Sequence, residues 1–132
     1  MTLVFADTFY FIALVSPADR AHPRAAEYAA LVDRVVTTEW VLLELADGLS
    51  DTDNRPLFST IRSGLHTNPF AEVIPLNMAL HERAIDLYTR RADKNWSLTD
   101  CVSFLVMEDR GLTDALTADR HFEQAGFVAL LK

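Results

Sequence analysis

The sequence predicts an α/β fold: a three-layer sandwich whose central sheet has about five mostly parallel strands, with helices on both faces. Short apolar runs alternate along the chain with longer segments that carry apolar residues at helical spacing. The first run, 3–6, shows no polar alternation, which is typical of a strand buried on both faces. The length of 132 residues suits one core, so we assign 1–132 to a single domain.

In the first half of the chain, each expected strand is followed by two helices. A proline at position 23 favours a helix start, because proline is tolerated in the first turn. Thr37 or Thr38 is available as the N-cap of a later helix. The expected elements are a strand over 3–6, helices from residues 8 and 22, a strand over 35–38, and helices over 40–48 and 56–66.

In the second half, the alternation continues with shorter strands. Pro75 lies near the end of a strand, which predicts a sheet edge or a strand terminus. Ser97 opens a helix that Gly111 closes as a C-cap. The expected elements are a strand over 71–76, helices over 78–91 and 97–110, and strands over 115–117 and 127–131.

Composition excludes several classes of protein. No apolar run approaches the ~20 residues of a membrane helix, and the stretch 9–15 has neither the basic start nor the cleavage site of a signal peptide. The single cysteine, Cys101, forms no internal disulfide, and we expect a cytoplasmic protein without a membrane partner. A net charge of −7 argues against nonspecific coating of nucleic acid. Two bound divalent ions would bring that sum to about −3.

Four acidic residues that are far apart in the sequence fall at strand ends or early in the following helix. Asp7 directly follows the first strand, and Asp119 follows the fourth. Glu44 and Asp100 lie in the first turns of the helices after residues 38 and 97. Because ligands of open parallel sheets bind beyond the carboxyl ends of the strands, all four can face one crevice.

Clustered carboxylates predict a metal site. Their oxygens are preferred ligands of hard cations such as Mg²⁺ and Mn²⁺, and like charges are costly to gather unless a cation neutralises them. Such a cation can activate water and offset charge on a phosphoryl group. The prediction is therefore metal-dependent phosphate chemistry at Asp7, Glu44, Asp100 and Asp119.

Each acid also has a structural interpretation. Ser97 and Asp100 fit a capping box, Asp7 fits an N-cap, and Asp119 fits a turn cap. Glu44 fits a solvated helix face. The metal site depends on the coincidence of all four at one sheet edge, not on any single residue.

Other residues admit local roles. We interpret His121 as a local hydrogen-bonding residue close to Asp119, and Trp96 as packing rather than a base-stacking platform. The basic group Arg90, Arg91 and Lys94 precedes Asp100 and is usually solvated in such a position, with contact to an RNA backbone as the alternative.

Five blocks of the sequence carry a resemblance to a known family. They are 4–8, 37–45, 93–101, 115–122 and 126–127, and they span nearly the whole chain. Together they resemble a PIN domain, in particular the toxin of VapBC-type toxin–antitoxin pairs. The most specific blocks are 93–101, DKNWSLTDC, and 115–122, ALTADRHF.

The resemblance implies a PIN-like fold and an endoribonuclease that uses Mg²⁺ or Mn²⁺. It implies that Asp7, Glu44, Asp100 and Asp119 are the catalytic, metal-binding acids. It also implies that Thr8, Ser97 and Thr117 are hydroxyl residues that support the ligands or the substrate phosphate. Further implied partners are an RNA substrate, an antitoxin protein and a second copy of the chain in a homodimer.

Alternatives remain open at this point. A non-toxin PIN nuclease of RNA processing and a PIN-fold interaction module share the same pattern, although no acid is missing as a module would predict. A haloacid-dehalogenase-type phosphatase needs an aspartate where this chain has Phe9. A receiver domain needs an early acidic pair and a phospho-acceptor at the third strand, and neither is evident.

Overall fold

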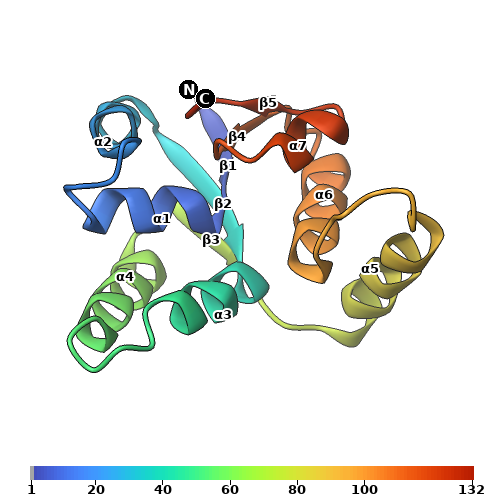
Figure 1. The fold of residues 1–132 in the computed structure, drawn as a ribbon, viewed down its shortest axis with the longest axis horizontal. Coiled ribbons are helices and arrows are strands. Elements are labelled where there is room, and N and C mark those ends of the chain that lie inside the picture. Colours follow the sequence, from blue (N-terminus) through green and yellow to red (C-terminus); the bar gives the residue numbers. More distant parts are fainter. Residues whose placement is uncertain (1) are drawn as a thin grey trace.

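Helices flank both faces of one five-stranded sheet in the computed structural model, which describes residues 2–132 (Figure 1). The strand order is β3-β2-β1-β4-β5, and every neighbouring pair is parallel. The predicted α/β sandwich is confirmed. The elements are β1 (Leu3–Ala6), α1 (Thr8–Val15), α2 (His22–Leu31), β2 (Arg34–Thr38), α3 (Glu39–Gly48), α4 (Arg55–Thr67), β3 (Ala71–Ile74), α5 (Met78–Arg90), α6 (Leu98–Arg110), β4 (Asp114–Leu116), α7 (Arg120–Gln124) and β5 (Val128–Ala129).

The strand β1 occupies the centre of the sheet. Val4, Phe5 and Ala6 are fully buried, as the apolar run without alternation predicted. Figure 1 shows α1, α2 and α4 on one side of the sheet and α5 and α6 on the other. Since β1 lies between β2 and β4, the residue that follows it emerges in the middle of the carboxyl edge.

Side-chain caps fix where the helices beside this edge begin. Thr38, not Thr37, is the N-cap of α3, because its hydroxyl accepts a 3.0 Å hydrogen bond from the Val41 amide. The Thr37 hydroxyl instead donates to the Ala6 carbonyl at 2.8 Å and ties β2 to β1. The helix α6 ends as predicted at Gly111, whose φ of 65° is a left-handed conformation that glycine adopts without strain.

The outer strands and one helix differ from the expected elements. Strand β3 ends at Ile74, directly before Pro75, and β5 is only Val128–Ala129, so both edge strands are shorter than predicted. The helix α7 is not among the expected elements, because five residues are too few to show a helical period. No helix within residues 2–132 is long and apolar enough to cross a membrane.

Candidate metal-binding active site

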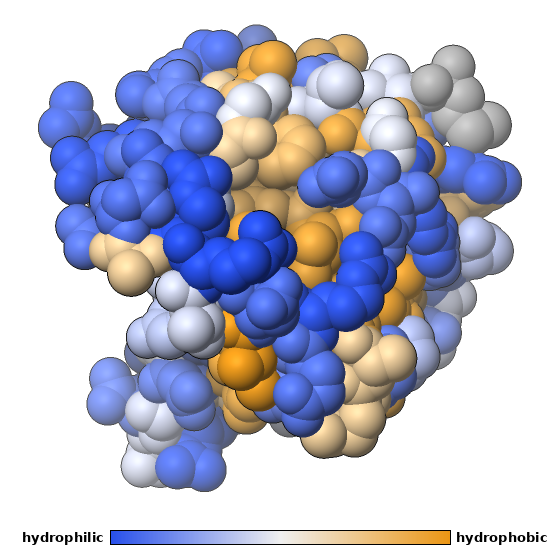
Figure 2. Space-filling view, turned by 90° about the vertical axis from the view of Figure 1, so that its right-hand side faces the viewer, coloured by the Kyte–Doolittle hydropathy of each residue, from blue (hydrophilic) through white to orange (hydrophobic). Residues whose placement is uncertain are grey.

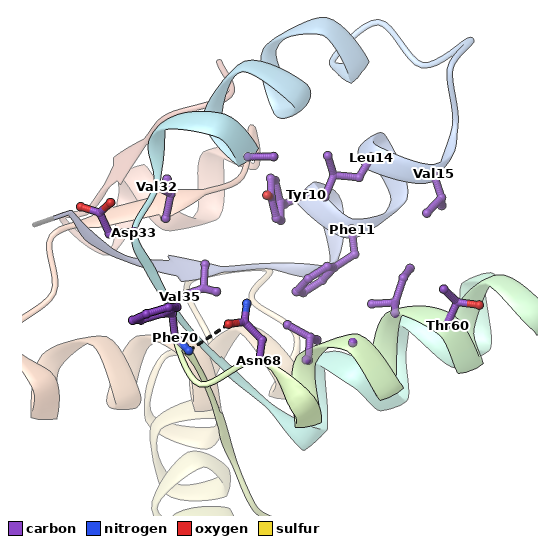
Figure 3. Close-up of a pocket in the computed structure, with 14 residues that line it drawn as sticks. Tyr10, Phe11, Leu14, Val15, Val32, Asp33, Val35, Thr60, Asn68 and Phe70 are labelled. Atoms are coloured by element: carbon purple, nitrogen blue, oxygen red, sulfur yellow. Dashed lines mark hydrogen bonds between the residues drawn. The ribbon is translucent and has the colours of Figure 1, made fainter.

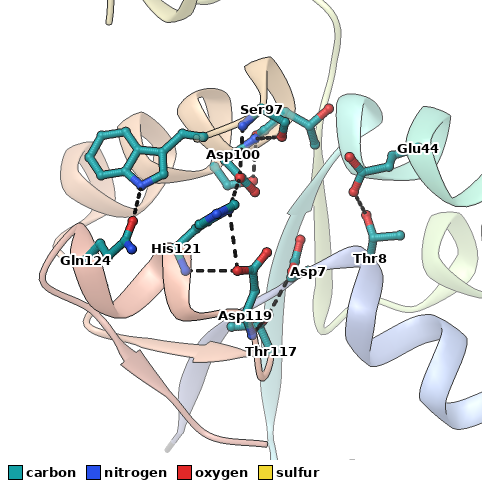
Figure 4. Close-up of polar contacts among 12 residues, drawn as sticks. Asp7, Thr8, Glu44, Ser97, Asp100, Thr117, Asp119, His121 and Gln124 are labelled. Carbon is teal, nitrogen blue, oxygen red and sulfur yellow. Dashed lines mark hydrogen bonds and ion pairs between the residues drawn. The ribbon is translucent and has the colours of Figure 1, made fainter. Parts of the chain in front are cut away.

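Four acidic side chains from four elements meet at the carboxyl edge of the sheet. Asp7 follows β1, Asp119 follows β4 and caps α7, Glu44 lies in α3, and Asp100 lies in the first turn of α6. Figure 4 shows their carboxylates arranged around one space beyond the strand ends. The sequence-predicted site residues are therefore brought together by the parallel topology.

Asp7 is the most buried acid of the group, at 5% exposure. Its Oδ2 accepts a 2.8 Å hydrogen bond from the hydroxyl of Thr117. Burial raises the pKa of Asp7 to about 7, the charges of Asp100 and Glu44 add to the rise, and the Thr117 hydrogen bond opposes it. A nearby cation stabilises the charged carboxylate and so lowers the raised pKa of such a buried carboxyl group.

Asp100 forms the capping box that the sequence predicted. Its Oδ2 accepts from the Ser97 amide at 3.1 Å, and its own amide donates to the Ser97 hydroxyl at 3.0 Å. Burial raises the pKa of Asp100, while the bond from Ser97 opposes the rise. Among residues 2–132 the hydrogen bonds to this carboxylate all use Oδ2, so Oδ1 stays available for another ligand. Capping and metal binding are compatible here.

His121 links Asp119 to Asp100. The Asp119 Oδ1 atom accepts from the His121 amide at 2.9 Å, which makes Asp119 the N-cap of α7. The His121 Nδ1 atom lies 3.0 Å from Asp100 Oδ2 and 3.5 Å from Asp119 Oδ1. The predicted local hydrogen bond of His121 is present through its amide, while its ring lies closest to a residue 21 positions away. Its contact with Asp100 joins two elements, and nothing in the local sequence indicated it.

Glu44 is held by α1. The hydroxyl of Thr8 donates a 2.6 Å hydrogen bond to Glu44 Oε1. Glu44 is half-buried, whereas Thr8 is buried. Thr8 follows Asp7 directly, so the start of α1 supplies one acid and positions another. The three hydroxyl residues named from the sequence thus each contact an acid or its backbone: Thr8, Ser97 and Thr117.

The donor set fits a divalent cation. Ligand atoms of Asp100, Asp119 and His121 lie within 4.8 Å of one another. Asp7 and Glu44 add carboxylate oxygens around the same space (Figure 4). Oxygen-rich sets of this kind suit hard cations, and gathered negative charge is costly without one. The chemistry of the acidic cluster therefore fits a divalent-metal centre.

A largely apolar hollow lies elsewhere in the described residues. It has a volume of about 390 Å³ between α1, α2 and α4, and Figure 3 shows Phe11, Leu14 and Phe70 among its lining residues. The acidic residue in its lining is Asp33, which does not belong to the cluster of four acids at the sheet edge. The hollow therefore offers no cluster of groups for phosphate chemistry, and the carboxyl edge of the sheet is the candidate site.

Comparison with known proteins points to one family. The family model described as PIN domain matches residues 4–128. The 23S rRNA-specific endonuclease VapC20 of Mycobacterium tuberculosis is 29% identical over 133 residues, which cover 96% of each chain. Its crystal structure, described as that of a Sarcin-Ricin loop cleaving toxin, superposes with a TM-score of 0.84 at 26% identity and covers 95% of this chain and 96% of that one.

Two further solved structures share the fold at lower identity. FitAcB from Neisseria gonorrhoeae has a TM-score of 0.65 at 15% identity, with 96% of this chain and 95% of that one covered. VapBC2 from Rickettsia felis, solved with a DNA fragment from its promoter, has a TM-score of 0.65 at 12% identity, with 97% and 96% covered. At these identities the likeness extends to the fold alone.

Proposed function

The chain belongs to the PIN-domain family, and from this premise we propose that it is a metal-dependent endoribonuclease, the toxin of a type II toxin–antitoxin pair. The observation that carries the proposal is the meeting of Asp7, Glu44, Asp100 and Asp119 at one sheet edge. The similarity to an rRNA-specific endonuclease over 96% of the chain supports RNA as the substrate class. The reaction is hydrolysis of a phosphodiester bond.

The four carboxylates are the proposed ligands of Mg²⁺ or Mn²⁺. A divalent cation bound there supplies Lewis acidity: it lowers the pKa of a water molecule and offsets the charge that builds on the phosphoryl oxygens. The hydroxyls of Thr8 and Thr117 orient Glu44 and Asp7 through hydrogen bonds of 2.6 and 2.8 Å. Ser97 orients Asp100 from the start of α6. Ligands fixed in this way need little rearrangement, which favours tight binding.

The protein's own groups also set the state of the carboxylates before a cation binds. In the metal-free chain burial raises the pKa of Asp7 to about 7, and cation binding would favour its ionised form. The His121 ring lies against two of the acids and offers a hydrogen to Asp100 Oδ2. No serine or cysteine nucleophile is needed: Cys101 is fully buried in the core, and burial raises the pKa of its thiol to about 11.

The proposed partners are RNA, an antitoxin protein and a second copy of this chain. They follow from membership of the family rather than from any contact within residues 2–132. The proposed place of action is the cytoplasm, where RNA and a coexpressed antitoxin are both present. A small DNA-binding protein encoded beside this gene, purified together with the chain, is the expected result of a coexpression test.

RNA cleavage with and without the acid at position 7 tests the function. We expect the wild-type protein to cut ribosomal RNA in Mg²⁺ or Mn²⁺ and to stop in EDTA, and Asp7→Asn to lose most activity. Asp47→Asn is the matched control, because Asp47 is an exposed acid on α3. Equal activity of wild type and Asp7→Asn would overturn the assignment of the site.

A further inference from the structure

A wide groove lies where α5 ends and α6 begins. Its volume is about 970 Å³, and its walls include Tyr88, Lys94, Asn95, Trp96 and Ser97. Figure 2 shows the side of the molecule that carries α5, where hydrophobic residues reach the surface between hydrophilic ones. A surface of this mixed character suits a ligand that has both apolar faces and charges.

The groove adjoins the acidic site through one shared residue. Ser97 lines the groove and also forms the capping box with Asp100, with a 3.1 Å hydrogen bond from its amide to Asp100 Oδ2. A chain that lay in the groove would therefore pass Ser97, the residue that holds the Asp100 carboxylate. This proximity ties the groove to the proposed ribonuclease site, and the inference rests on that function.

The groove holds a cation that is free to bind an anion. Lys94 makes no ion pair with any of residues 2–132, whereas Arg90 pairs with Asp86 at 2.8 Å and Arg91 pairs with Asp93 at 3.0 Å. In a chain of net charge −7, phosphates approaching four carboxylates are repelled overall. An ammonium without an ion pair in the adjoining groove offsets part of that repulsion for phosphates that flank the site.

Two aromatic residues line the groove, and they differ in exposure. Tyr88 is 52% exposed, and its hydroxyl makes no hydrogen bond within the described part of the chain. Trp96 is buried: its Nε1 donates to Gln124 Oε1 at 3.0 Å, and the Arg91 guanidinium lies 4.9 Å from its ring centre. Trp96 is thus packing, as the sequence indicated, and Tyr88 is the ring that a base can stack on.

We propose that this groove binds the single-stranded RNA next to the scissile phosphate. Tyr88 stacks on a base, Lys94 pairs with a phosphate, and the Asn95 amide faces polar edges of the nucleotide. The chemistry matches how proteins bind unpaired RNA, in which bases stack on aromatic side chains and cations follow the backbone. Lys94 by itself would bind any phosphate, whereas the Tyr88 ring in the same groove favours a nucleotide, whose base can stack on it.

Kinetics of two groove variants test the proposal. Tyr88→Ala and Lys94→Gln are each expected to raise KM for an RNA oligonucleotide about 10-fold with little change in kcat, and Tyr88→Phe is expected to behave as wild type. Phe70→Ala and Arg34→Gln are matched controls, because both side chains are exposed and neither lines the groove. Unchanged KM in both groove variants overturns the proposal while leaving the ribonuclease function in place.

A binding measurement separates failure of the groove from failure of the function. In an Asp7→Asn background, the fluorescence anisotropy of a labelled single-stranded RNA reports affinity without cleavage. We expect Tyr88→Ala and Lys94→Gln to weaken this binding about 10-fold, and the same substitutions in a chain that retains Asp7 to leave Mn²⁺ affinity unchanged. If the variants bind RNA normally but lose a protein partner, the groove is a protein surface and the proposal is wrong. If wild type cuts no RNA yet the variants still weaken RNA binding, the groove stands and the nuclease function falls.

Discussion

The Thr117 hydroxyl donates a 2.8 Å hydrogen bond to Asp7 Oδ2, which joins two strand ends that are 110 residues apart in sequence. The same hydroxyl oxygen accepts from the Asp119 amide at 3.1 Å. Thr117 is fully buried, so water does not compete for either bond. One side chain therefore sets the positions of two of the four acids.

Replacing Thr117 by valine is expected to weaken cation binding by about 10- to 100-fold, because the shape is kept while the bonds that hold Asp7 and Asp119 are lost. Calorimetric titration with Mn²⁺ measures the affinity. Thr117→Ser retains the hydroxyl and is expected to bind nearly as well as wild type. Wild-type affinity in Thr117→Val would contradict this role.

The pKa of Asp7 predicts how stability changes with pH in the metal-free protein. Because burial raises this pKa from its ordinary 3.8 to about 7, the folded chain binds the proton more tightly than the unfolded chain. The free energy of unfolding therefore falls as pH rises from about 4 to about 7. Above about pH 7 Asp7 is charged in the folded chain, so the full free-energy cost of burying that charge is present.

Asp7→Asn removes this dependence, because the amide carries no charge at any of these pH values. In EDTA at pH 8 the variant is expected to be more stable than wild type by on the order of 3 kcal/mol, and the difference is expected to shrink at pH 5. Urea unfolding at both pH values measures it. The exposed control Asp47→Asn is expected to show no such trend. If the stability advantage of Asp7→Asn over wild type instead increased toward low pH, the prediction would be contradicted.

The sequence predicts the parallel sheet and the four acids for the same physical reason. Buried parallel strands show as apolar runs, and their carboxyl ends share one edge, so residues after β1 and β4 were expected at the same edge; that these two strands are direct neighbours comes from the structure. The geometry of Asp7 and Asp119 was accessible by that reasoning. The contact between His121 and Asp100 was not, because it depends on how α7 packs against α6.

Edge strands and short helices were the less predictable parts. An edge strand pairs on one side only, so its ends depend on local features such as Pro75 rather than on an apolar period. The helix α7 has five residues and is defined by its Asp119 cap and by Phe122, which is fully buried. Tertiary packing, not the local pattern, decides that it is a helix.

Loss of the His121 ring is expected to weaken cation binding about 10-fold, because its Nδ1 atom lies 3.0 Å from Asp100 Oδ2 and helps to hold that carboxylate. His121→Asn is expected to retain more affinity than His121→Ala, since the asparagine amide nitrogen occupies a similar place to Nδ1. His66→Ala is the control, because His66 is exposed on α4 and pairs with Glu39. Equal affinity in His121→Ala and wild type would rule out a positioning role.

The burial of Phe122 couples the stability of the fold to the acidic site. Its ring is fully buried, 5.0 Å from the Phe104 ring and 6.3 Å from the Phe5 ring between centroids, and it anchors the short helix that Asp119 caps.

Phe122→Ala is expected to cost about 3–5 kcal/mol of unfolding free energy, measured by urea denaturation. Because α7 is released with it, Mn²⁺ affinity is expected to fall even where the protein remains folded. Phe70→Ala, at an exposed ring, is expected to change neither quantity by much. A folded Phe122→Ala protein with wild-type Mn²⁺ affinity would show that Asp119 keeps its place without the anchor.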